Sequence, residues 1–278
     1  MKILMVIIRW KGGVGRVAEN QKRVFEKLGH EVKVISREDD LKCFTTRDGW
    51  RELRRAVDKE GYDILYVQDW SCAIPLLAYK NVFVNFNGVE ATHPRLQKIV
   101  AMAQRKKLTV ISGQLKTIFP NATLAHVGVD LDKFKNLELE RKPGTIGFAN
   151  FPTNDYNYSK IKKAAEETGL EFVEIKMKLS ADEMVEFYNK LEYFISLPLV
   201  GAGFNMSWVE AMACNVPKII GNYNGVGKSL DITHVESHSS VSEAIKKAVD
   251  NRPYKINEDF NWESQGKLIL NLFERNRR

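Results

Sequence analysis

The segment Lys2–Ser36 decides the fold, with the sequence KILMVIIRWKGGVGRVAENQKRVFEKLGHEVKVIS. Its opening residues, Lys2–Ile8, form a continuous β-branched and apolar run, typical of a strand buried on both faces of a parallel sheet. After a glycine loop, Arg16–Leu28 carries apolar residues at helical spacing, and Gly29 ends this helix. The segment Glu31–Ser36 is a second strand. A strand, a helix and a strand within about 35 residues predict a βαβ unit with a right-handed crossover.

The same alternation continues along the chain, interrupted by a polar and charged segment, Lys135–Pro143, that is typical of a linker. Further strands are predicted at Asp63–Gln68, Val82–Phe86, Leu108–Ser112, Thr145–Phe148, Glu171–Lys176, Tyr193–Leu197 and Lys218–Ile220. Helices are predicted at Trp50–Glu60, Ala73–Tyr79, Pro94–Lys106, Ser159–Thr168, Ala181–Leu191, Met206–Cys214, Val241–Val249 and Phe260–Arg278. This order predicts an α/β protein with two consecutive doubly wound domains.

Composition narrows the class of protein. The chain has 278 residues, of which 44% are hydrophobic and 28% charged, as in soluble globular proteins. No apolar run is long enough for a transmembrane helix, and no small-residue cleavage site follows the apolar N-terminus, so a signal peptide is not expected. Cys43, Cys72 and Cys214 lie far apart, and no Cys/His spacing fits a zinc site. We therefore expect a reduced, cytoplasmic protein without a bound metal.

The net charge of +7 is unevenly distributed along the chain. Residues 1–138 contain 24 Lys and Arg against 16 Asp and Glu, whereas residues 139–278 contain 18 against 19. The first half is therefore expected to face an anionic partner. The alternative is a basic surface that only serves solubility.

The first glycine loop allows two interpretations. Gly13–Ala18 has the sequence GVGRVA, which matches the dinucleotide fingerprint G-x-G-x-x-A, and the acids Glu38–Asp40 follow where a ribose-binding acid would lie. Glycines at this point let backbone N–H groups and a helix N-terminus approach a phosphate. The alternative is that Gly12, Gly13 and Gly15 only permit a tight turn from strand to helix.

A second and more specific motif is Gly201–Ile220, with the sequence GAGFNMSWVEAMACNVPKII. Its glycines precede a helix N-terminus at Met206 or Ser207, so free backbone N–H groups are expected there. Glu210 lies one turn into this helix, where its carboxylate can accept two hydrogen bonds from a vicinal diol such as a ribose. The alternative for Glu210 is a first-turn acid that complements the helix dipole.

This second motif resembles the donor-site signature of the retaining GT-B-fold glycosyltransferases, the "glycosyl transferases group 1" family. Four further segments are similar to successive parts of that family: Gly12–Val14, Asp63–Asp69, Val127–Phe134 and Phe260–Glu263. The resemblance implies a GT-B fold of two doubly wound Rossmann-like domains facing a cleft. It implies an acceptor-side domain in residues 1–138, a nucleotide-sugar-binding domain in 139–259, and a C-terminal helix in 260–278 that crosses back to the first domain.

The resemblance also implies roles for individual residues. Gly12 and Gly13 would place backbone N–H groups near the donor phosphate and the acceptor. Asn87 occupies the place where many members have a histidine near the sugar, so Asn87 and Gly13 are the expected catalytic residues. Glu210 would bind the nucleotide ribose, and Lys160 would neutralise the departing diphosphate. The sugar and the diphosphate would accept hydrogen bonds from main-chain N–H groups of Gly203, Phe204, Asn205, Met206 and Ser207.

The chain departs from the family pattern at three positions. Ala202 stands where the family has the first glutamate of its pair, and Asn150 is the nearest substitute for an arginine. Asn87 stands at the position of the family's histidine, unless His93 fills the role of that histidine. Each missing contact to a charged group would cost about 1.5–3 kcal/mol, so an altered donor preference is expected.

The function implied by the resemblance is the transfer of a sugar from a nucleotide-sugar donor, such as a UDP- or GDP-sugar, with retention of anomeric configuration. In this chemistry the protein positions groups and stabilises charge, without a metal or other cofactor. The first alternative is a catalytically impaired sugar-nucleotide-binding protein, because of Ala202 and the missing arginine. The second is an NAD(P)-dependent oxidoreductase, because of the fingerprint in Gly13–Ala18.

The basic first half suggests the kind of acceptor. Arg51, Arg54 and Arg55 share one predicted helix, and Arg105–Lys107 end another. These cations would suit an anionic acceptor, the inner face of a membrane, or a nucleic acid. The alternative is a solvated helix face.

Overall fold

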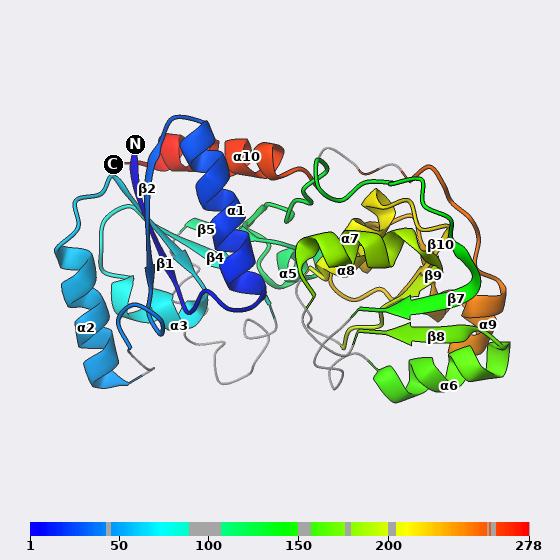
Figure 1. The fold of residues 1–278 in the computed structure, drawn as a ribbon. Helices are drawn as coiled ribbons and strands as arrows, with labels where there is room; N and C mark the ends of the chain where they lie inside the picture. The colour runs from blue at the N-terminus through cyan, green and yellow to red at the C-terminus, as the bar shows by residue number, and fades with distance from the viewer. Residues whose placement is uncertain are drawn as a thin grey trace. The chain divides into compact units, whose positions relative to one another are not determined.

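The computed structural model describes residues 1–42, 46–88, 107–149, 157–175, 179–199, 204–254, 256 and 260–277. The chain forms two compact units (Figure 1). Unit 1 comprises Met1–Val127 and Trp262–Arg278, and unit 2 comprises Gly128–Asn261. The domain limits expected after residues 138 and 259 stay predictions.

Unit 1 is built on a parallel sheet of six described strands in the order β2-β1-β3-β4-β5-β6. These strands are β1 (Lys2–Ile7), β2 (Glu31–Ser36), β3 (Ile64–Gln68), β4 (Val82–Phe86), β5 (Lys107–Val110) and β6 (Thr123–Leu124). The helices are α1 (Gly13–Lys27), α2 (Arg47–Asp58), α3 (Trp70–Ala73), the 3-10 helix η1 (Ile74–Leu76), α5 (Gly113–Ile118) and α10 (Trp262–Asn276). Because β2 and β3 lie on opposite sides of β1, the winding of the chain reverses between β1 and β3.

The C-terminal helix α10 belongs to unit 1, where it packs beside α1 (Figure 1). Phe273 of α10 is fully buried, with its ring centroid 4.7 Å from that of Phe83 and 5.2 Å from that of Tyr66. Gly266 permits this close packing, since a Cβ at its position would lie 2.4 Å from Cγ1 of Val24 in α1. The predicted return of the last helix to the first part of the chain is confirmed.

Unit 2 is built on a second parallel sheet, whose described strands have the order β11-β10-β9-β7-β8. They are β7 (Lys142–Phe148), β8 (Glu171–Glu174), β9 (Leu191–Ile195), β10 (Lys218–Gly221) and β11 (Thr233–His234). The helices are α6 (Tyr158–Thr168), α7 (Ala181–Asn189), α8 (Met206–Ala213) and α9 (Val241–Lys246), with the 3-10 helices η5 (Gly227–Ser229) and η6 (Val235–Ser237). The winding reverses between β7 and β9. Two parallel sheets with helices confirm the predicted α/β class.

Several helices differ from the prediction at their ends. Helix α2 begins at Arg47, earlier than expected, because the Thr46 side chain accepts a hydrogen bond from the first turn and caps it. The helix expected at Ala73–Tyr79 is replaced by α3 and η1, since Asp69 caps the chain directly after β3. The helix expected at Pro94–Lys106 lies outside the described residues.

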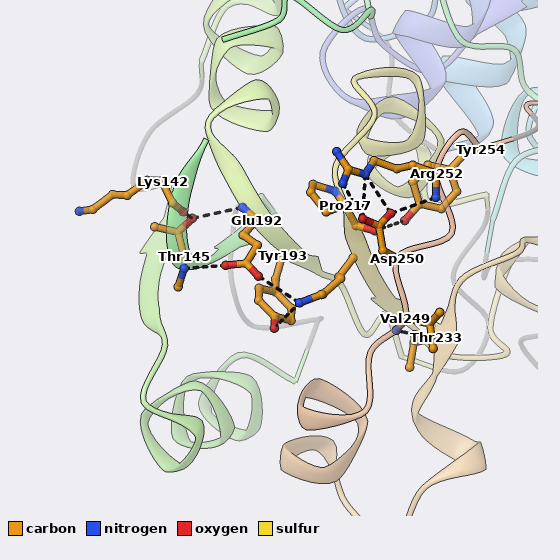
Figure 2. A network of polar contacts seen from close by, with 12 residues as sticks. Lys142, Thr145, Glu192, Tyr193, Pro217, Thr233, Val249, Asp250, Arg252 and Tyr254 are labelled. Carbon is orange, nitrogen blue, oxygen red and sulfur yellow. Dashed lines mark hydrogen bonds and ion pairs between the residues drawn. The ribbon is translucent and has the colours of Figure 1, made fainter. Parts of the chain in front are cut away.

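Polar contacts join the strands and loops at the amino edge of the unit 2 sheet, where the strands begin (Figure 2). Glu192 of β9 accepts hydrogen bonds from the Gly144 N–H at 2.7 Å and from Lys218 Nζ at 3.0 Å. The Tyr254 hydroxyl donates to the Pro217 carbonyl at 3.0 Å, and burial raises the pKa of Tyr254. These groups hold strands and loops together at this edge. A ligand is expected at the other, carboxyl edge, where parallel α/β sheets bind their ligands.

The segment expected to be a linker, Lys135–Pro143, is bonded to the rest of unit 2 through Arg141. The half-buried Arg141 guanidinium donates four hydrogen bonds of 2.9–3.1 Å, and burial lowers its pKa. The acceptors are the carbonyls of Tyr188, Leu191, Cys214 and Asn215. These carbonyls lie at and just beyond the C-terminal ends of α7 and α8, where helix carbonyls lack intrahelical partners and favour a cation.

We expect Arg141→Met to lower the free energy of unfolding by about 3 kcal/mol, because several carbonyls lose a charged donor. Arg141→Lys is expected to recover only part of this loss, since an ammonium cannot reproduce the guanidinium fork. Urea unfolding followed by circular dichroism measures both changes. Arg51→Met is the matched control: its guanidinium contacts the exposed Asp48 at 2.9 Å, and its loss should cost under about 1 kcal/mol. Equal stability of Arg141→Met and the parent protein would contradict this role.

Candidate functional site

A pocket of about 400 Å³ lies at the carboxyl edge of the unit 1 sheet. Its lining follows three strands: Ile8, Arg9 and Lys11–Val14 come after β1, Arg37 and Glu38 after β2, and Asp69–Ser71 after β3. The pocket therefore lies where the winding of the sheet reverses, which is the usual ligand position in open α/β sheets.

The three glycines of the first loop have different reasons to be glycine. Gly12 has a φ of +96°, a left-handed conformation that favours glycine. At Gly15, a Cβ would lie 1.9 Å from the Trp10 carbonyl oxygen, so a side chain cannot fit. Gly13 lies at the first position of α1, with nothing within 4 Å of a Cβ placed there and without a left-handed φ. The fold thus requires Gly12 and Gly15, whereas Gly13 leaves open space in the pocket wall.

Charged side chains are held rigidly beside this loop. Arg37 is only 3% exposed, and its guanidinium donates to Ser71 Oγ and to Glu38 Oε1, both at 3.0 Å. Asp69 is 4% exposed, and its Oδ1 accepts a hydrogen bond from the Ser71 N–H at 2.8 Å. Arg9, which is exposed, also lines the pocket, so charges of both signs lie next to the N–H groups of the first turn of α1.

The acids after β2 are engaged within unit 1. Asp39 Oδ2 accepts hydrogen bonds from the Trp10 N–H at 2.5 Å and from Ser36 Oγ at 2.9 Å, and these bonds lower the pKa of Asp39. Asp40 Oδ2 accepts from the Ser36 N–H at 2.7 Å, and Glu38 is paired with Arg37. One oxygen of each acid is thus engaged within unit 1, so these acids have a structural role at the end of β2 whether or not a ribose binds there.

Asn87 lies directly after β4, at the same carboxyl edge of the sheet. It is half-buried, and its Nδ2 donates to Gln68 Oε1 at 2.9 Å. Its Oδ1 accepts from Asn85 Nδ2 at 2.8 Å. The side chain is therefore oriented by two buried amides of neighbouring strands.

The residues expected to hold the sugar and diphosphate begin the α8 helix of unit 2. Asn205 is the N-cap in a left-handed conformation, and its Nδ2 donates to Ser196 Oγ at 3.1 Å. Ser207 Oγ donates to Asn205 Oδ1 at 3.0 Å, and the Phe204 side chain is buried. These side chains are used within the unit, so the groups suited to a ligand are the main-chain N–H groups from Met206 onward.

Three asparagines hold the loop after β9, next to the reversal of winding in unit 2. Asn157 Nδ2 donates to the Leu197 carbonyl at 2.9 Å. Asn222 and Asn224 both donate to the Pro198 carbonyl at 2.8 Å. Sequence reasoning missed these residues; their only local signal is an asparagine in a turn after a strand or before a helix.

Glu210 lies one turn into α8 and is only 4% exposed. The Tyr188 hydroxyl of α7 donates to its Oε2 at 3.1 Å. Burial, followed by the charge of Glu210, raises the pKa of the Cys214 thiol to about 12. The Glu210 carboxylate is thus buried in unit 2 and held by α7, on the same helix whose first turn follows the N-cap Asn205.

The remaining predicted residues are placed as follows. Lys160 is exposed in the first turn of α6, the helix that follows β7 and starts at the same carboxyl edge. Gly203, Ala202, Asn150, His93, Cys43 and Arg105–Lys106 lie outside the described residues.

The basic residues of α2 already have local partners. Arg51 pairs with Asp48 at 2.9 Å, Arg55 pairs with Glu52 at 2.5 Å, and Arg54 Nε donates to the Pro75 carbonyl. These contacts agree with the alternative of a solvated helix face.

Among the residues that the structure describes, no three His, Cys, Asp or Glu side chains are grouped to hold a metal ion. No helix within the described ranges is long and apolar enough to cross a membrane. The free thiol of Cys72 is buried, which raises its pKa to about 12 and keeps it protonated.

The sequence matches no protein-family model and no curated protein. Solved structures match the fold. A glycosyltransferase from Rickettsia africae ESF-5 has 13% identity and a TM-score of 0.73, covering 99% of this chain and 98% of that chain. Sucrose-phosphate synthase from Thermosynechococcus elongatus has 13% identity and a TM-score of 0.69, with 99% of both chains covered. The chain has the GT-B fold.

A third GT-B structure is that of HepE from Anabaena, determined in complex with UDP and glucose. It has 13% identity and a TM-score of 0.67, with 99% of both chains covered. The GT-B fold implied by the sequence motifs is thus confirmed for the whole length of the chain. A sequence identity of 13% supports similarity of fold and nothing beyond it.

The glycines of the first loop provide a matched pair of variants. We expect Gly15→Ala to lower the melting temperature by several degrees, because its Cβ would overlap the Trp10 carbonyl. Gly13→Ala is expected to leave the melting temperature within about 1 °C, since its Cβ meets open space. Differential scanning calorimetry compares the two. A Gly13→Ala protein as destabilised as Gly15→Ala would show that the fold also requires Gly13.

Proposed function

We propose that the protein transfers a sugar from a nucleotide-sugar donor to an acceptor, with retention of anomeric configuration. The observation that carries this proposal is the carboxyl edge of unit 2, where α8 begins after the left-handed N-cap Asn205 and carries the buried Glu210 in its second turn. Similarity in fold to glycosyltransferases, one of them solved with UDP and glucose, supports it.

In the proposed donor complex, the N–H groups of Met206 and Ser207 bind the diphosphate, as helix N-termini bind anions. Glu210 accepts hydrogen bonds from the two hydroxyls of the ribose, while Tyr188 keeps one carboxylate oxygen in place. Lys160 neutralises charge that develops on the leaving diphosphate. The proposed transfer uses no metal ion, because these groups supply the positive potential.

The proposed reaction joins the acceptor oxygen to the anomeric carbon on the face from which the diphosphate leaves. The bond between that carbon and the phosphate oxygen breaks, and a donor phosphate oxygen takes the proton of the acceptor hydroxyl. Asn87 meets the sugar with its amide. Gly13 lets a phosphate or the acceptor approach the main chain closely, which explains a glycine that the fold does not need.

The pocket of unit 1 favours an acceptor with an anionic group. Arg9, Lys11 and Arg37 line it together with two acids, and Arg37 is held in place by Ser71. The anionic group is a phosphate or carboxylate of a sugar or lipid acceptor; a membrane surface or a nucleic acid offers the same chemistry. Initial rates with matched acceptors that carry or lack this group test the preference, and equal rates would contradict it.

Calorimetric titration with UDP-, GDP-, ADP- and dTDP-sugars tests the donor site. We expect one donor class to bind, and Glu210→Ala to weaken its binding at least tenfold, or about 1.4 kcal/mol. Glu192→Ala is the matched control, because this carboxylate lies at the opposite edge of the same sheet. Its donor affinity is expected to stay within about twofold of the parent value.

The outcomes separate the candidate functions. Binding together with transfer, and a product whose anomeric proton shows the donor's configuration by NMR, supports a retaining transferase. Binding without transfer or donor hydrolysis would indicate a sugar-nucleotide-binding protein that has lost catalysis. Absence of binding, or equal effects of Glu210→Ala and Glu192→Ala, would contradict the proposal.

A further inference from the structure

A chain of buried amides crosses unit 1 from α10 to Asn87. Gln265 Nε2 donates to the Ala125 carbonyl at 3.2 Å, and Gln21 Nε2 of α1 donates to Gln265 Oε1 at 3.2 Å. Gln68 Nε2 of β3 donates to Gln21 Oε1 at 2.7 Å, and Asn87 Nδ2 donates to Gln68 Oε1 at 2.9 Å. The three glutamines are at most 3% exposed. Each of these amides therefore donates one hydrogen bond to the next acceptor in the series.

The direction of these hydrogen bonds is set at the inner end. The Ala125 carbonyl can only accept, so Gln265 must turn its NH2 group toward it and its oxygen toward the next amide. The same argument applies at each following amide along the chain. Asn87 is consequently held with its NH2 group toward Gln68, and its oxygen accepts from Asn85 Nδ2 at 2.8 Å.

We infer that Gln21 and Gln68 are positioning residues that fix which atom of the Asn87 amide is the donor at the candidate site. An amide offers two N–H hydrogens and two carbonyl lone pairs, and unit 1 uses one of each on Asn87. The other hydrogen and lone pair take no partner among the described residues and are available to a ligand. The inference rests on the proposed function, in which Asn87 meets the donor sugar.

Asn85 Nδ2 also donates to Gln68 Oε1 at 2.8 Å, so the amides of Gln68, Asn85 and Asn87 change direction only together. Without the direction set at Ala125, all three would be free to flip by 180° with almost no change in shape. The donor and acceptor of Asn87 would then exchange places, and a sugar hydroxyl or a phosphate oxygen would meet the wrong atom. These hydrogen bonds therefore do more than connect α10 to the sheet. The Ala125 carbonyl at one end determines which atom of Asn87 is the donor at the carboxyl edge.

A side branch of the same network provides a control. The Thr109 hydroxyl donates to Asn85 Oδ1 at 2.7 Å and is fully buried. Thr109 contacts Asn87 only through Asn85, and a hydroxyl can either donate or accept, so Thr109 does not set the direction of these hydrogen bonds. Thr109→Val therefore removes a buried hydrogen bond, while Gln265, Gln21 and Gln68 still set that direction.

Two substitutions of Gln21 test the inference by transfer kinetics. Gln21→Met leaves the Gln68 N–H without its acceptor, which favours the flipped orientation of the amides from Gln68 to Asn87. We therefore expect kcat to fall about fivefold or more at unchanged donor affinity. Gln21→Glu is expected to restore kcat to within about twofold, because a buried glutamate is protonated: its hydroxyl donates to Gln265 and its carbonyl accepts from Gln68. Thr109→Val should also stay within about twofold.

An Asn87→Ala background tests whether Gln21 acts on kcat through the Asn87 side chain. If Gln21 acts only through Asn87, then Gln21→Met is expected to change kcat by less than about twofold in that background. An undiminished loss there, or equal losses in Gln21→Met and Thr109→Val, would overturn the inference and leave a general effect on the core.

NMR of the Asn87 side-chain NH2 group gives a second readout that needs no turnover, with Asn87→Asp assigning the signals. The parent protein and Gln21→Glu are expected to show two sharp, separate proton signals, and Gln21→Met shifted or exchange-broadened ones. If this pattern holds while no transfer is found, the proposed function fails and the positioning stands. If transfer depends on Asn87 while neither kcat nor the NMR signals respond to Gln21→Met, the positioning is refuted.

Discussion

Both sheets of the chain are parallel, and each parallel strand must be followed by a crossover that returns to the same end of the sheet. Every strand thus delivers its following loop to the carboxyl edge. In unit 1 this brings Gly13, Arg37 and Asp69 into one pocket, although they follow three different strands. In unit 2 it brings the N-cap Asn205 beside Ser196. The amino edge of unit 2 carries polar contacts that hold the fold together.

Left-handed backbone at this edge serves both the turns and the site. Gly12 has a φ of +96° before α1, and Asn157 and Asn205 have φ values of 55° and 60° before α6 and α8. Glycine adopts this conformation without a steric cost, and asparagine tolerates it better than other side chains. The two asparagines also donate their side-chain amides to the loop after β9. The same residues therefore turn the chain and fix the loop at which the donor is proposed to bind.

The sequence predicts those features whose signals are local. The apolar run of β1, the stripe of α1 and its end at Gly29 all lie within one stretch of chain, and the βαβ pattern sets the direction of the sheet. The first turn of α8 and Glu210 also follow from one continuous motif. Helix ends were less accurate where a cap decides them, as Thr46 does for α2 and Asp69 for α3.

Features that depend on distant residues were not predicted. Gln21 and Gln68 meet only after the sheet has formed, and glutamine is mostly an exposed residue, so nothing local marks these two as buried. Arg141 lies in a charged segment typical of a linker, and its partners are carbonyls far along the chain. Asn222 resembles an ordinary turn residue until its bond to Pro198 is seen.

Hydrogen–deuterium exchange with and without the donor that binds tests the central claim most directly. If the first turn of α8 binds the diphosphate, the N–H groups of Met206, Ser207 and Trp208 are expected to exchange at least about tenfold more slowly at saturating donor. The N–H of Gly144, at the opposite edge of the same sheet, is expected to exchange at an unchanged rate. Protection that leaves the first turn of α8 unchanged and lies elsewhere in the chain would contradict the account.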